Sequence, residues 1–181
     1  GRFDKRKLFW DKGQRLTGLT LGFGGVWMTS APHLLFLPDR DGDDVPDGEP
    51  EVELDGFSTL ARHNMVNGLR WGPDGWLYGC QGFATPSTVG KPVNGGTILH
   101  KGDAFPTNIE VKDGQFIDGG VWRYHPTKDR FEVVAHGFSN PWGLDFDDRG
   151  QMFITACVIP HLWHVIPGGF SHRQGGKHIN P

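Results

Sequence analysis

The chain of 181 residues has few cysteines, no long apolar run and no strong excess of charge of either sign. Its two cysteines, Cys80 and Cys157, are too few for a disulfide framework, and the sequence leaves open whether they form one bridge or stay free. No stretch approaches the roughly 18 to 20 uninterrupted apolar residues of a membrane-spanning helix. The formal net charge is −3, and basic residues form a run only at 5–7, which argues against nucleic acid as a partner.

Several chemical motifs are also missing from the sequence. There is no Cys-x-x-Cys pair for zinc, no Ser-His-Asp pattern, and no P-loop or Gly-x-Gly-x-x-Gly phosphate loop. His161 and His164 lie three residues apart on an expected strand, so they face opposite sides and do not share a metal ion. Because no initiator methionine or signal peptide is present, the sequence is expected to be a piece of a longer protein.

Glycine, proline and large aromatic residues are abundant instead. The chain contains 28 glycines and 13 prolines, together about twice their usual share, beside 13 phenylalanines and 7 tryptophans. A chain with so many aromatic rings and only 22% charged residues buries its rings rather than staying disordered. Many tight turns that join short aromatic-rich strands predict an all-β fold.

One sequence pattern occurs three times: Gly-Leu, then a second glycine seven residues after the first, then a β-forming run. The first glycines of the three repeats are Gly18, Gly68 and Gly143. The β-forming runs are residues 26–30, 76–80 and 151–155. Residues 73–75 and 148–150 are typical turn sequences, because their glycines adopt positive φ angles without strain. Each repeat therefore predicts a strand, a tight turn and a second strand.

Further strands are expected after each of these units, at residues 33–37, 120–124, 130–134 and 161–166. Sets of about four short strands with a recurring glycine are typical of β-propeller blades. The predicted architecture is thus a partial β-propeller, about three blades of a six-bladed ring, with residues 1–181 forming one fragment of that domain. Residues 83–119, rich in Gly, Pro, Thr and Asn, are expected to be a long inserted loop. A three-layer β-sandwich with an accidental glycine spacing is the alternative.

An acidic segment, residues 39–48, follows the first repeat. Its candidate metal ligands are Asp39, Asp41, Asp43 and Asp47. Hard oxygen ligands on a short loop with a glycine for a sharp turn are what Ca²⁺ requires. The spacing departs from an EF-hand at its last position and is closer to the shorter Asp-rich calcium loops of extracellular repeats. The segment therefore predicts a calcium site, with a solvated acidic turn as the alternative.

Polar residues precede the second and third repeats at matching positions. His63 lies five residues before Gly68, and Asn140 lies three residues before Gly143. At the mouth of the inner strands of a propeller, both side chains would face the central channel. There His63 could act as a general base, since the pKa of a free histidine is about 6.5. The alternatives are that His63 caps a loop and that Asn140 only starts a turn before Pro141.

Three segments, residues 63–79, 140–148 and 161–169, resemble a membrane-bound dehydrogenase family of planctomycetes and related bacteria. The resemblance extends from about residue 8 to residue 181. It implies a propeller domain that precedes helical-repeat and c-type cytochrome modules in a longer, periplasmic, extracellular or membrane-associated protein. More distantly, the chain is similar to soluble quinoprotein glucose and sorbosone dehydrogenases, six-bladed propellers that use pyrroloquinoline quinone (PQQ) together with Ca²⁺.

The likeness to quinoproteins also implies a set of site residues. His63 matches the base that removes a proton from the sugar hydroxyl, although it lies one residue further from Gly-Pro-Asp than in those enzymes. Where they have an Arg-Asn pair that contacts quinone and substrate, this chain has Ser139 and Asn140. The missing arginine removes a positive charge that would stabilise the anion of the reduced cofactor. Asn64 and Arg70 complete the expected cofactor-binding residues.

Two functions follow from these observations. The first is a PQQ-dependent dehydrogenase that oxidises a sugar-type alcohol or aldehyde, with His63 as general base and a c-type cytochrome module outside this chain as electron acceptor. The second is a non-catalytic propeller that binds polysaccharide or a protein partner, with residues 39–47 as a structural calcium loop. A cluster of cations for the three PQQ carboxylates would discriminate between them, and the sequence offers Arg62, Arg70 and Arg123.

Overall fold

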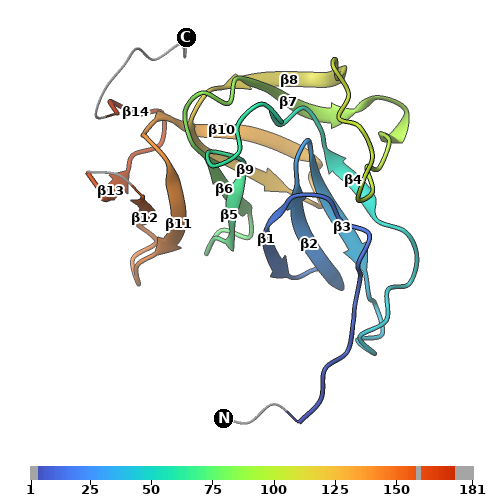
Figure 1. Ribbon diagram of the computed structural model, residues 1–181. Coiled ribbons are helices and arrows are strands. Elements are labelled where there is room, and N and C mark those ends of the chain that lie inside the picture. Colours follow the sequence, from blue (N-terminus) through green and yellow to red (C-terminus); the bar gives the residue numbers. More distant parts are fainter. Residues whose placement is uncertain (1–3, 158–159, 174–181) are drawn as a thin grey trace.

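The computed structural model describes residues 4–157 and 160–173, and their regular structure is almost entirely β (Figure 1). The described strands form sheets of four, five, three and two strands. The predicted all-β class is confirmed. Within the described ranges, no helix is long and apolar enough to cross a membrane.

The first three sheets follow one another along the chain. The first sheet has the order β1 (Leu16–Leu21), β2 (Gly25–Ser30), β3 (His33–Pro38) and β4 (Glu51–Leu54). The second is built from β5 (Asn67–Trp71), β6 (Leu77–Gln81), β9 (Gly120–His125) and β10 (Arg130–Gly137), with the short β14 (Phe170–Ser171) pairing parallel to β10. The third has the order β11 (Pro141–Phe146), β12 (Met152–Ala156) and β13 (Leu162–Val165). All strand pairs within these sheets, apart from β10 with β14, are antiparallel.

The strand–turn–strand unit expected in each repeat is present, as β1–β2, β5–β6 and β11–β12. The first strand of each unit contacts the first strand of the next, so that β5 lies between β1 and β11. Each of these first strands also has a register shift at or beside its repeat glycine. A Cβ atom on Gly18, Gly68 or Gly143 would lie 3.0, 2.8 or 2.4 Å from a side chain of the neighbouring strand. The repeat glycines therefore mark equivalent bulges where two strands approach too closely for a larger residue.

Residues 83–119 were expected to be a long loop, and this expectation is wrong for part of the segment. It contains β7 (Ser87–Pro92), the short 3-10 helix η1 (Val93–Gly95) and β8 (Val111–Ile117), and the two strands pair antiparallel. Buried positions on β7 include Ser87 and Gly90 beside Val89. Because these small residues replace apolar ones, the alternation that would have revealed a strand is absent from the sequence.

Buried apolar side chains, many of them aromatic, form clusters that join the sheets. The largest cluster includes Trp27 on β2, Trp122 and Tyr124 on β9, and Phe57 after β4. A second cluster between the second and third sheets includes Phe138 and Ile154. Neighbouring sheets thus pack through their apolar faces, which is the main source of stability in such a fold.

The first and third sheets, on either side of the second sheet, leave apolar side chains exposed. Leu19 and Leu21 on β1 are 68% and 69% exposed, and Leu162 on β13 is 62% exposed. Leu19 and Leu21 line a groove of about 720 Å³ on the first sheet, together with Phe9 and Trp10. Exposed apolar surface of this extent marks a face that another element can cover.

The two cysteines are both free thiols. Cys80 is fully buried, and burial raises the pKa of its thiol to about 12. Cys157 is exposed. The bridge that the sequence left open is therefore absent from this structure, and Cys80 acts as a core residue.

Candidate functional site

The three first strands begin at a common end of the molecule, where they are tied together laterally. The hydroxyl of Thr17, on β1, donates a hydrogen bond to the carbonyl of Val66. The amide Nδ2 of the buried Asn67, on β5, donates to the carbonyls of Met65 at 2.8 Å and Pro141 at 3.1 Å. Asn67 was not predicted as a key residue, although its place directly before a repeat glycine is a signal that could have identified it.

Three of the predicted site residues meet at this end. Asn64 donates from Nδ2 to the carbonyl of Phe83 at 2.8 Å, and the N–H of Phe83 donates to the carbonyl of Ser139 at 2.9 Å. A Cβ atom on Gly82 would lie 2.8 Å from Asn64 Cβ and 3.0 Å from Asn140 Oδ1. The segments before the second and third repeats are therefore in close contact, with Gly82 between them.

The amide of Asn140 has unused hydrogen-bonding capacity. The residue is 7% exposed, and its Oδ1 has no hydrogen-bond partner among the described residues. Its Nδ2 lies 3.3 Å from the Sγ of Cys157, a weak acceptor. Since buried polar atoms are nearly always paired, Asn140 Oδ1 is an unsatisfied acceptor at this end of the molecule.

Two further polar side chains lie near the amides of Asn64 and Asn140: His63 is next to Asn64 in the chain, and Arg173 is close in space. His63 precedes Asn64, is exposed, and has no hydrogen bond to any described residue. The guanidinium carbon of Arg173 lies 3.8 Å from the centre of the Phe83 ring, a cation–π contact. Arg173 was not predicted, because it lies far beyond the third repeat glycine and belongs to no motif.

Arg70 lies apart from this group. It extends from β5 and forms an ion pair with Asp145 on β11, with an N–O distance of 3.0 Å. Both side chains are more than half exposed, so this pair adds little stability. Arg70 thus links two neighbouring first strands instead of joining Asn64 and Asn140.

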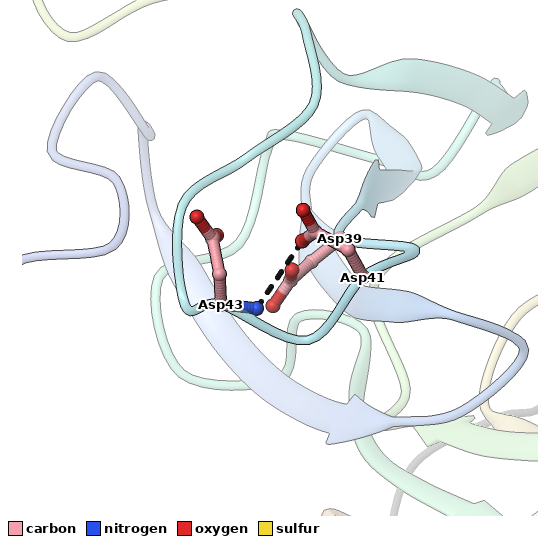
Figure 2. A group of neighbouring side chains, drawn as sticks. All are labelled: Asp39, Asp41 and Asp43. Carbon is pink, nitrogen blue, oxygen red and sulfur yellow. Dashed lines mark hydrogen bonds between the residues drawn. The ribbon is translucent and has the colours of Figure 1, made fainter.

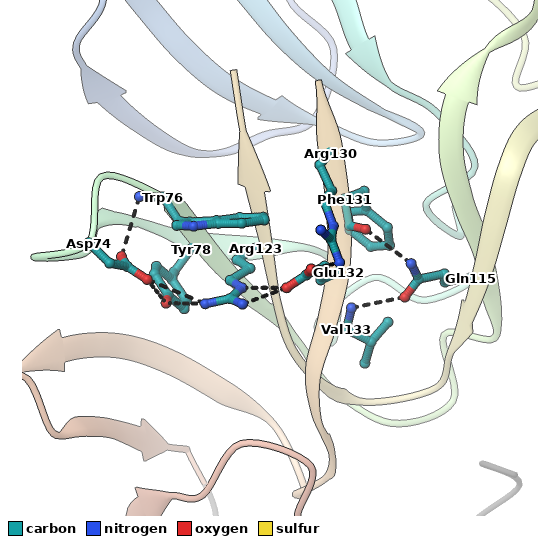
Figure 3. Close-up of polar contacts among 9 residues, drawn as sticks. All are labelled: Asp74, Trp76, Tyr78, Gln115, Arg123, Arg130, Phe131, Glu132 and Val133. Atoms are coloured by element: carbon teal, nitrogen blue, oxygen red, sulfur yellow. Dashed lines mark hydrogen bonds and ion pairs between the residues drawn. The ribbon is translucent and has the colours of Figure 1, made fainter. Parts of the chain in front are cut away.

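Arg123, a further candidate cation, is engaged in a polar network on the second sheet (Figure 3). Its Nε lies 2.8 Å from Glu132, and its Nη1 lies 3.3 Å from Asp74 and 3.2 Å from the hydroxyl of Tyr78. Its guanidinium also lies 4.1 Å from the ring centre of Trp76. Burial, reinforced by the hydrogen bond to Asp74, raises the pKa of Tyr78 to about 12, so this hydroxyl stays protonated in the network.

The acidic loop brings together three of its four predicted ligands (Figure 2). Asp39, Asp41 and Asp43 each offer one carboxylate oxygen, and these oxygens lie within 4.8 Å of one another. Asp39 Oδ1 is buried without a hydrogen-bond partner among the described residues, whereas Asp41 Oδ1 accepts the N–H of Asp43 at 3.2 Å. Asp47 does not join them; its Oδ2 accepts the N–H of Arg40 at 2.7 Å and closes the loop.

A family model matches residues 1–178 and is described as a domain of unknown function, DUF7133. The chain belongs to this family. No match was found among curated proteins or among solved structures.

The charges of this DUF7133 chain bear on the expected quinone cofactor. PQQ carries three carboxylates, which require a group of free cations. Arg70 and Arg123 are each compensated by carboxylates and lie outside the Asn64–Asn140 group. Near that group in the described residues are the exposed Arg62, two residues before Asn64 in the chain, and Arg173, whose guanidinium contacts Phe83. These two cations are fewer than the three carboxylates of PQQ.

Proposed function

We propose that the three larger sheets of this protein are blades of a β-propeller, about three of six. Three features support this architecture: the repeated order of antiparallel strands, the adjacent first strands, and the bulge at each repeat glycine. The exposed leucines on β1 and β13 support it as well, because further sheets of the same kind would cover them.

Within this architecture, we infer that the protein is a recognition module for a sugar-type ligand, such as a polysaccharide. The observation that carries this proposal is the convergence of Asn64, Ser139 and Asn140 around Gly82, from segments that precede two different repeats. The unpartnered Oδ1 of Asn140 accepts a hydroxyl hydrogen, and the exposed His63 offers a second polar group beside it. Specific recognition of sugars depends on a few polar groups placed in this way.

Replacing Asn140 by Ala is expected to weaken binding of an oligosaccharide about tenfold, the equivalent of about 1.4 kcal/mol, because it removes one or two hydrogen bonds. The measurement is titration calorimetry with cellohexaose, xylohexaose and mannohexaose on the protein with and without the substitution. The matched control is Asn94→Gly, which removes an exposed amide at φ 54° on the inserted segment and retains the backbone conformation. Absence of binding of all three hexasaccharides at about 10 mM would reject the recognition proposal.

Quinone-dependent oxidation of a sugar is the second candidate, favoured by the exposed imidazole of His63 and the neighbouring charge of Arg173. It is tested by titrating PQQ in the presence of Ca²⁺ while tryptophan fluorescence is followed, and then by sugar-dependent reduction of a dye. In an oxidising enzyme, His63→Ala removes turnover and leaves PQQ binding in place. In a recognition module, the same substitution changes oligosaccharide affinity by no more than a few-fold.

We further propose that the acidic loop binds Ca²⁺ and stabilises the first sheet. Millimolar Ca²⁺ is expected to raise the melting temperature of the protein, since a cation bound only by the folded state stabilises it by mass action. Asp41→Asn together with Asp43→Asn removes two of the three grouped carboxylates and should abolish the shift. Asp44→Asn, an exposed neighbour outside the group, should leave the shift unchanged. Equal shifts in both variants would show that Ca²⁺ acts elsewhere.

A further inference from the structure

A second polar site lies at the first sheet, beneath the segment that connects β7 to β8. It is a cavity of about 400 Å³, lined on the sheet side by His33 and Asp55 and on the other side by residues between Val93 and Glu110. His33 is the first residue of β3, and Asp55 follows directly after β4. The sequence pattern indicated only that His33 belongs to a strand, and neither residue takes part in the group around Gly82.

His33 and Asp55 form a buried pair. Their side chains are 3% and 8% exposed, and His33 Nδ1 lies 3.1 Å from Asp55 Oδ1. The same carboxylate oxygen accepts the N–H of Gly56 at 2.8 Å. The backbone of Asp55 exchanges two hydrogen bonds with Gly90 on β7, at 2.9 and 3.1 Å. The carboxylate is therefore held beside the imidazole, although neither ring nitrogen of His33 has a hydrogen-bond partner among the described residues.

The ring nitrogens of His33 have unused hydrogen-bonding capacity. Both Nδ1 and Nε2 are buried and have no hydrogen-bond partner among the described residues. A neutral imidazole has one N–H donor and one acceptor nitrogen. Because buried polar atoms are normally paired, an unpartnered imidazole on a residue that lines a cavity indicates a ligand that can both donate and accept hydrogen bonds, as a hydroxyl group does.

The remaining lining residues restrict the class of ligand. Thr97, Asn108 and Glu110 add hydroxyl, amide and carboxylate groups, whereas Val93, Leu99 and Ile109 are apolar. Lysine and arginine are absent from this lining, and the two carboxylates repel an anion. A lining of both polar and apolar side chains suits a pyranose ring, which presents hydroxyl groups at its edge and C–H groups on its faces. The volume lies at the small end of the range for ligand sites.

We propose that this cavity binds a neutral, hydroxyl-rich molecule of monosaccharide size, with one ligand hydroxyl hydrogen-bonded to the imidazole of His33. This site is separate from the one at Asn140, and the proposal stands without it.

The test measures binding of glucose, galactose, mannose and xylose to the unmodified protein by saturation-transfer NMR and calorimetry. Ala104→Trp places an indole in the cavity from an exposed position of the connecting segment, so it should abolish binding without disturbing the core. His33→Phe retains a ring of similar size but removes both ring nitrogens, so it should weaken binding at least tenfold. The ¹⁵N chemical shifts of His33 in the unmodified protein, measured with and without sugar, report directly whether the ligand contacts a ring nitrogen.

Asn140→Ala is the control that separates the two sites, and monosaccharide affinity at the His33 cavity should not respond to it. Binding that Ala104→Trp leaves intact would overturn the proposal, as would the absence of binding for all four monosaccharides. Loss of oligosaccharide binding in Asn140→Ala with unchanged monosaccharide binding would support both sites independently.

Discussion

Trp122→Ala is expected to lower the free energy of unfolding by about 3–5 kcal/mol, the range found when a buried tryptophan is truncated. Trp122 on β9 is fully buried, and its ring centre lies 5.3 Å from that of Phe57 and 6.1 Å from that of Phe131. The indole also covers Gly79 on the adjacent β6, where a Cβ atom would lie 2.2 Å from Trp122 Cζ2. Its removal leaves a cavity in the cluster that joins the first and second sheets.

Urea denaturation followed by circular dichroism measures the loss for Trp122→Ala, and Trp142→Ala serves as the control. Trp142 is 43% exposed on β11, so its truncation should cost less than about 1 kcal/mol. If Trp122→Ala fails to fold, Trp122→Phe provides an intermediate loss that can still be measured. Similar losses for the two alanine variants would contradict the assignment of Trp122 to the centre of the core.

The strand pairs could be predicted from the sequence because their signals are local. Gly75 and Gly150 have φ angles of +81° and +76°, as expected for the glycines that close the turns of the second and third repeats. The segments before the second and third repeats, which the sequence predicted to meet through His63 and Asn140, are in contact at Asn64 and Asn140, with Gly82 between them. Neighbouring first strands begin at one end of the molecule, so equivalent places in the sequence become neighbours in space.

Features that depend on distant partners could not be predicted in this way. The pairing of Arg70 with Asp145 and the pairing of His33 with Asp55 both join separate strands, and neither partner carries a local motif. In the acidic loop, the alternating spacing of Asp39, Asp41 and Asp43 correctly predicted that their carboxylates lie together. Asp47 lies apart because its carboxylate accepts a hydrogen bond from the backbone N–H of Arg40. Composition and spacing define candidate residues, and tertiary contacts decide which of them act together.

Gly68→Ala is expected to lower the free energy of unfolding by about 2–4 kcal/mol, through two separable effects. Gly68 has a φ angle of +70°, where an L-residue costs about 1 kcal/mol. In addition, a Cβ atom at this position would lie 2.8 Å from the Sγ of the buried Cys80 on β6, and such overpacking costs about 1–3 kcal/mol. Urea denaturation of both the parent protein and the variant measures the total.

Gly75→Ala isolates the first effect, since Gly75 has a φ angle of +81° and no atom within 4 Å of the added Cβ. It should cost only about 1 kcal/mol. Cys80→Ala in the Gly68→Ala background isolates the second effect, because removing Sγ relieves the contact and should give a favourable coupling of about 1–2 kcal/mol. Equal losses of unfolding free energy in Gly68→Ala and Gly75→Ala, or zero coupling between positions 68 and 80, would mean that glycine is needed at position 68 only for its positive φ angle. A favourable coupling would instead identify the close approach of β5 and β6 as the reason for glycine here, and the same argument would extend to Gly18 beside Thr29 and Gly143 beside Thr155.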